Sequence, residues 1–162
     1  MKLHIAIEDV QDAEADVGKQ LRALGERHAA EHDLYHLGHT LAKQCEQHAQ
    51  QLRPFAERYA APREHEPHDG HAWSDTLERI RHKLSELIAR QPTGILLLND
   101  LRHVFLTAQD AGVLWVMVAQ AAQAIRDPEL LQLCTACHTD TQAQMHWLLT
   151  RIKTAAPQAL TV

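Results

Sequence analysis

The chain has 162 residues, enough for one domain with a full-sized hydrophobic core. Its net charge of −5 and isoelectric point near 6.2 argue against nucleic acid as the main partner. Aromatic residues are few, and residues that favour helices dominate, so the composition indicates an all-α fold. Thirteen histidines are the unusual feature of the composition.

The expected compartment is the cytoplasm, because the first 18 residues contain no apolar core of the kind that signal peptides carry. The three cysteines should therefore be thiols or metal ligands rather than disulfides. The longest uninterrupted apolar run is Ala111 to Ala119, against the roughly 20 residues that cross a membrane. We therefore expect no membrane partner.

Two helices are predicted first, over residues 3–30 and 33–59, because apolar residues recur at steps of three and four. Glu14 interrupts the apolar seam of the first helix, and Cys45 and His48 interrupt that of the second. The short break between the helices implies an antiparallel hairpin. Since Glu14 and His48 each lie 17 residues from its centre at residue 31, we expect them to face each other across the core.

A proline- and histidine-rich connector follows, then a short predicted helix over residues 74–90. The next segment, residues 94–126, is so apolar that we expect a central helix buried on most sides. Its polar residues share one stripe with two apolar ones, and we expect that stripe to be packed. The stripe consists of Asp100, His103, Thr107, Asp110, Leu114 and Met117.

The last predicted helix covers residues 128–154 and ends before Pro157. Asp127 should cap its start, with Pro128 in the first helical position. The fold class is therefore all-α: a four-helix bundle of two helical hairpins, joined by a crossover that carries a short extra helix.

Two hairpins joined by a long crossover resemble the ferritin-like superfamily in architecture, over a single domain spanning residues 1–162. Members that bind two metal ions carry a lone Glu on two helices and Glu-x-x-His on the other two. Glu14 matches one lone Glu, and Asp110 could stand for the other. Cys45-Glu46-Gln47-His48 has Cys where the motif has Glu, and Ala143-Gln144-Met145-His146 has no acid in that place. The resemblance therefore implies at most a reduced or mononuclear metal site, with redox or storage chemistry.

The first candidate site is this metal site inside the bundle. Carboxylates and imidazole suit iron, manganese or zinc. The alternative is a buried Glu–His pair that only fixes the register of the helices, as in a non-catalytic interaction or scaffold protein. The candidate metal ligands are Glu14, Cys45, His48 and Asp110.

The second candidate is the Cys-x-x-Cys-His string formed by Cys134, Cys137 and His138. It is similar to the haem attachment motif of c-type cytochromes. Haem is less expected than a metal ion, because the attachment takes place outside the cytoplasm. The same three residues could hold a soft metal such as zinc, or be buried thiols beside a histidine.

The remaining histidines cluster near the first turn and in the connector, where they could bind metal ions at the surface or only adventitiously. They are His32, His36, His39, His65, His68 and His71. Self-association into a homo-oligomer is left open, and whether the protein is an enzyme is undecided at this stage.

Overall fold

A computed structural model describes residues 2–60 and 93–161 of the chain. They form four helices: α1 (Leu3–Arg27), α2 (His32–Tyr59), α4 (Thr93–Ala124) and α5 (Pro128–Leu160). No strand occurs within these two ranges. The expected all-α class is therefore confirmed, whereas the expected helix over residues 74–90 lies outside the described residues.

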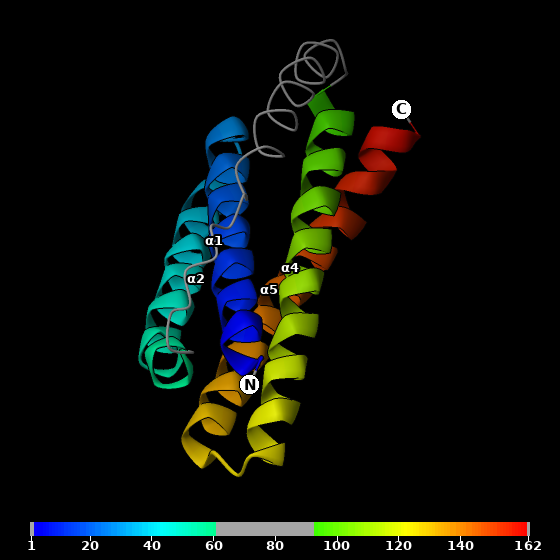
Figure 1. Ribbon diagram of the computed structural model, residues 1–162. Coiled ribbons are helices and arrows are strands. Elements are labelled where there is room, and N and C mark those ends of the chain that lie inside the picture. Colours follow the sequence, from blue (N-terminus) through cyan, green and yellow to red (C-terminus); the bar gives the residue numbers. More distant parts are fainter. Residues whose placement is uncertain (1, 61–92, 162) are drawn as a thin grey trace, which may run out of the picture.

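The four helices pack around a shared core, with α1 beside α2 and α4 beside α5 (Figure 1). Helix α1 also packs along α4, whereas α2 and α5 make fewer contacts. Ion pairs join α2 and α5 at both ends of the bundle. Arg151 lies 3.0 Å from Asp33 at one end, and Arg58 lies 2.9 Å from Glu129 at the other.

Helices α1 and α2 approach closely because glycines line their contact. A Cβ atom on Gly38 would lie only 2.7 Å from the carbonyl oxygen of Leu21, so the backbones could not approach this far with a larger residue there. The two helices form an antiparallel hairpin, as Gly18 meets Ala42 while Gly25 meets Leu34. The predicted first hairpin is thus confirmed.

The turn between α4 and α5 is held by Asp127, whose carboxylate accepts hydrogen bonds from the backbone N–H groups of Glu129 (3.1 Å) and Leu130 (3.0 Å). Pro128 occupies the first helical position, as predicted. The predicted end of α5 before Pro157 is wrong, because the helix continues through this proline to Leu160. Pro157 has no N–H to donate to the carbonyl of Lys153, and only three residues of the helix follow it.

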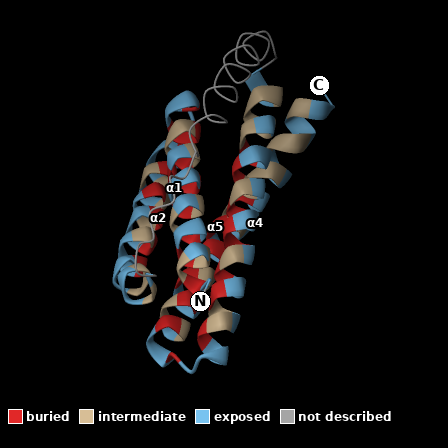
Figure 2. Ribbon diagram, viewed as in Figure 1, coloured by how far each residue is buried: buried red, intermediate tan, exposed pale blue. Residues whose placement is uncertain are grey.

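Helix α4 is not the buried central helix that its composition predicts. Only one stripe of it is buried, and the opposite face is exposed along its length (Figure 2). The stripe that we expected to be packed lies largely outside, with His103, Asp110 and Met117 all exposed. The buried residues of α4 are Leu101, Val104, Ala108, Ala111, Gly112, Trp115, Val118 and Ala122.

Candidate functional site

Glu14 and His48 lie opposite each other in the core, as the hairpin register predicts. The Nδ1 atom of His48 is 3.3 Å from Oε2 of Glu14. Glu14 is 1% exposed and His48 is 3% exposed, so both are removed from water. A carboxylate buried this deeply must be compensated by nearby charge or hydrogen-bond donors.

The other carboxylate oxygen of Glu14 is bound from the second hairpin. The indole N–H of Trp115 on α4 donates to Oε1 of Glu14 at 2.6 Å. The hydroxyl of Thr141 on α5 lies 3.4 Å from the same oxygen and donates at 2.9 Å to the carbonyl of Cys137. The other three helices thus each contribute a residue to the surroundings of this one buried carboxylate.

His48 continues this arrangement toward the surface. Its Nε2 atom lies 3.2 Å from Oδ2 of Asp140 on α5, and the side chain of Asp140 is 47% exposed. Burial alone would lower the pKa of His48, but the carboxylates of Glu14 and Asp140 outweigh it, so the pKa is raised. The imidazolium form carries an N–H on each nitrogen and therefore faces both carboxylates as a cation. We call Glu14, His48 and Asp140 the buried triad.

Cys45 lies beside the buried triad as a protonated thiol. Burial, followed by the nearby charge of Glu14, raises the pKa of Cys45 well above its usual value. Its Sγ atom is 3.7 Å from the side-chain oxygen of Gln144, whose amide nitrogen donates to Gln44 at 2.8 Å. Neutral hydrogen-bonding groups, not a further charge, thus flank the triad on this side.

The expected metal-ligand set is not brought together. Asp110 is exposed on the outer side of α4, so its assignment to the interior is wrong. The two nitrogens of His48 face two different carboxylates, whereas a metal site needs its donors to point at one place. In residues 2–60 and 93–161, no three His, Cys, Asp or Glu side chains are grouped so that they could hold a metal ion. The donors present therefore do not fit the iron, manganese or zinc site that the resemblance implies.

The two cysteines of the Cys-x-x-Cys-His string point into the core. Cys134 and Cys137 are buried, and burial raises the pKa of each thiol to about 12. They pack with Trp115 and Leu130, while His138 is only half-buried. The two thiols pack among apolar core side chains, and within the described residues His138 does not join them in a group that could hold a metal ion, so the string forms neither a haem pocket nor a soft-metal site.

The histidines of the first turn lie near one tyrosine. The rings of His36 and His39 meet the ring of Tyr35 edge-on, at centroid distances of 5.3 and 4.8 Å. His32 and His36 are exposed, and His39 is half-buried. The other three candidates, His65, His68 and His71, fall outside the described residues.

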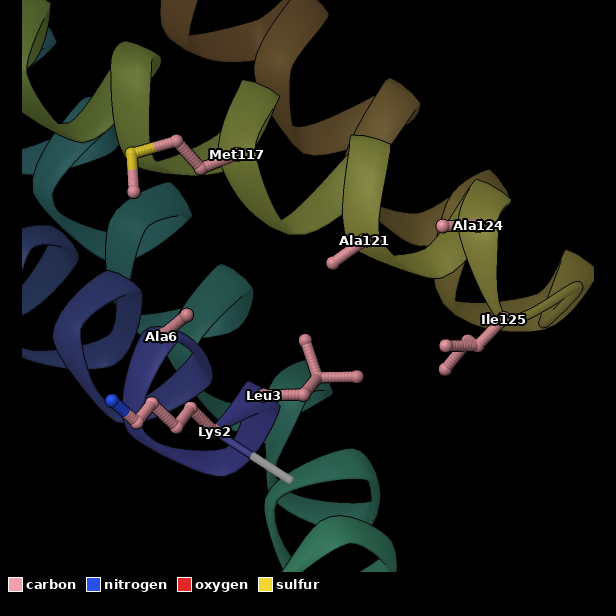
Figure 3. Close-up of a pocket in the computed structure, with 7 residues that line it drawn as sticks. All are labelled: Lys2, Leu3, Ala6, Met117, Ala121, Ala124 and Ile125. Atoms are coloured by element: carbon pink, nitrogen blue, oxygen red, sulfur yellow. The ribbon is translucent and has the colours of Figure 1, made fainter.

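The second feature of functional interest is an apolar surface on α4, which composition alone did not reveal. Met117 is 55% exposed, Val113 50% and Leu106 49%, and their helical spacing places them on one row. Beside this row, at the end of α4 and the start of α1, lies an apolar groove (Figure 3). We call the row and the groove together the α4 face. The groove is lined by Lys2, Leu3, Ala6, Met117, Ala121, Ala124 and Ile125.

This face includes two charged side chains, Asp110 in the row and Lys2 in the groove. Between Arg102 and Arg126 the only acidic or basic residues of α4 are His103 and Asp110. By length and composition, α4 could also span a membrane, with a mean hydropathy of 1.3, and a third of that window is buried. Core helices of soluble proteins meet the same criterion, so the criterion does not distinguish the two cases.

Comparison with known proteins adds no relative: no family model, no curated protein and no solved structure matches the chain.

The sequence analysis missed two residues that contact the Glu14–His48 pair: Trp115, which donates to Glu14, and Asp140, which faces His48. The signal for Asp140 was available, because the α4–α5 turn places it near the level of Glu14 and His48. Its face could not be assigned in advance, since polar and apolar residues alternate irregularly around α5. Trp115 was hidden in a helix that is apolar on every side.

Proposed function

We propose that the protein is a non-catalytic helical interaction protein, which binds a partner through the α4 face. The observation that carries this proposal is the row of Leu106, Val113 and Met117, each about half exposed on a well-packed helix. Large apolar side chains gathered on one exposed helix face usually mark an interaction site, and here only Asp110 interrupts the row. Helices dock such surfaces by laying an apolar side into a groove.

The interior supports a structural rather than a chemical role for the buried polar residues. Both oxygens of Glu14 already have partners, His48 on one side and Trp115 on the other. A group that reacts with substrate needs access, whereas Glu14 and Cys45 are fully packed. In this proposal the buried triad fixes how the two hairpins fit together, which is an attested use of buried polar groups.

The ferritin-like architecture is part of the same proposal. Helices α2 and α4 both run antiparallel to α1: Gly18 meets Ala42, and Gln20 meets Thr107. They are therefore parallel to each other, as in bundles whose hairpins are joined by one long crossover. We propose this connection for residues 61–92, and a cytoplasmic location for the chain.

Site-specific photo-crosslinking tests the proposed function. A benzophenone amino acid at Val113 should give a crosslinked product in cells that express the protein, because a docked partner would lie against this position. The matched control is the same amino acid at Gln50, which is exposed on α2 away from the α4 face. No product at Val113, or equal products at Val113 and Gln50, would contradict binding through the α4 face.

A further inference from the structure

The α4 face has an acidic edge formed by α1. Asp9 follows Ala6 by three residues, and Asp16 follows Ala13 by three. Since Ala6 lines the groove and residues three apart are neighbours on a helix, Asp9 and Asp16 lie on the side of α1 that flanks α4. Both are exposed, and neither forms a salt bridge within residues 2–60 and 93–161.

The cations of α1 near this edge lie at its two ends, at Lys2 in the groove and at Lys19 beyond Asp16. Between Lys2 and Lys19 the helix carries acids but neither Lys nor Arg. Asp110 adds a further exposed carboxylate on α4. The surface thus combines an apolar row, Leu106 to Met117, which Asp110 interrupts, with the two unpaired carboxylates of Asp9 and Asp16 along one side.

The other edge of the α4 face is formed by α5. This helix has neither Lys nor Arg between Pro128 and Thr150. A second copy of the chain is therefore a poor complement. Antiparallel two-fold packing of α4 on α4 sets the two acidic α1 edges against each other, and parallel packing sets α1 against this cation-free part of α5. Like charges that face each other across an interface disfavour it.

We propose that the α4 face binds an amphipathic helix that has an apolar side and a row of Lys or Arg along the edge facing α1. This inference rests on the proposed function and names its partner class. The row from Leu106 to Ala124 is about 27 Å long at 1.5 Å per residue, which suits a partner helix of about 18 residues. Apolar contact provides affinity, and the carboxylates of Asp9 and Asp16 select the charge.

Synthetic peptides test the partner class directly. Three helical peptides of the same length share one leucine face and differ only in their flanking residues, which are Lys, Gln or Glu. Binding to the full chain is measured by fluorescence anisotropy at low and high salt. We expect the Lys peptide to bind at least tenfold more tightly than the Glu peptide at low salt, and this ratio to shrink in high salt because the charges are exposed.

Variants of the protein then test whether the carboxylates of Asp9 and Asp16 cause the preference for the Lys peptide. Asp9→Asn with Asp16→Asn should reduce the Lys-to-Glu preference to about threefold or less. The control pair, Glu8→Gln with Glu57→Gln, removes two exposed acids and should leave most of the preference. Val113→Ser and Met117→Ser should each weaken all three peptides. Both side chains are about half exposed, and circular dichroism checks that the variants fold.

The outcomes separate this inference from the proposed function. Equal binding of the Lys and Glu peptides, or equal losses in the two acid-to-amide pairs, would overturn the basic partner while leaving the α4 face as a binding surface. A dimer in analytical ultracentrifugation that Val113→Ser dissociates would replace the basic helix by a second copy. Binding to neutral lipid vesicles without peptide binding would replace it by a membrane. A monomer that binds neither peptides nor vesicles would overturn both the inference and the proposed function.

Discussion

At the scale of residues, the central feature is a histidine that lies between two carboxylates. Glu14 is fully buried, whereas the side chain of Asp140 is 47% exposed, and the ring of His48 connects the two. Removing one partner strands a buried charge, while replacing both by apolar residues avoids the cost of burying charges. The triad therefore makes the stability of the fold sensitive to the protonation of His48.

The first prediction concerns pH. The pKa of His48 is raised in the folded protein above its ordinary value of about 6.5. The stability that the charged ring contributes is therefore fully present below about pH 6.5 and is lost as the pH rises through the folded pKa. Urea melts of the wild type should show this loss on the alkaline side, and His48→Gln should flatten it. A His48→Gln profile parallel to that of the wild type would contradict the assigned role.

The second prediction separates a structural pair from a metal site. Glu14→Leu or His48→Leu alone should cost roughly 3–5 kcal/mol, because each leaves a buried polar partner. The double Leu variant should be more stable than either single variant, with a residual loss of about 1–3 kcal/mol at most because the buried indole N–H of Trp115 loses its acceptor. Melting each protein with and without a chelator completes the test. Wild type that loses stability in chelator down to the level of the single variants would support a metal site instead, since a metal ion stabilises the folded state it binds.

At the scale of elements, the two helical hairpins differ in how closely their helices pack. The α1–α2 contact requires glycine, since a Cβ on Gly38 would lie 2.7 Å from the carbonyl oxygen of Leu21. The α4–α5 contact has room, since a Cβ on Gly112 would lie 3.7 Å from the nearest atom of Met145. The first hairpin is thus the less tolerant of the two.

The third prediction uses these two glycines as a matched pair. Gly38→Ala should destabilise the protein by about 1–3 kcal/mol, because the backbone of α1 must move. Gly112→Ala should be neutral or stabilising by up to about 1 kcal/mol, because alanine favours the helix and its methyl group fits. Denaturant unfolding of both variants gives the comparison. Equal effects would mean that the close approach of α1 and α2 is wrong.

At the scale of the whole molecule, the sequence predicts which side of a helix is buried only where its apolar and polar faces differ clearly. Glu14 and His48 could be paired because both interrupt clear apolar seams at equal distances from a turn. Asp110 was grouped with this pair, but the residue of α4 that reaches Glu14 is Trp115, and Asp110 lies on the outer side. Its side could not be assigned because α4 is apolar almost all round and has no polar face to orient it. Because α4 has so many apolar residues, it was predicted to be buried on most sides. In the structure, some of these residues form the exposed row along which we place the binding site.

We thus assign the fit of the two hairpins to the buried triad, and we propose that binding takes place on the α4 face. Binding should then survive replacement of the interior pair but not a change on the α4 face. The most direct test is the affinity of the Lys peptide for two variants. Glu14→Leu with His48→Leu should bind it within about twofold of the wild type, and Val113→Ser should bind it at least tenfold more weakly. The reverse ranking, with binding lost in the interior variant and kept in Val113→Ser, would contradict this assignment.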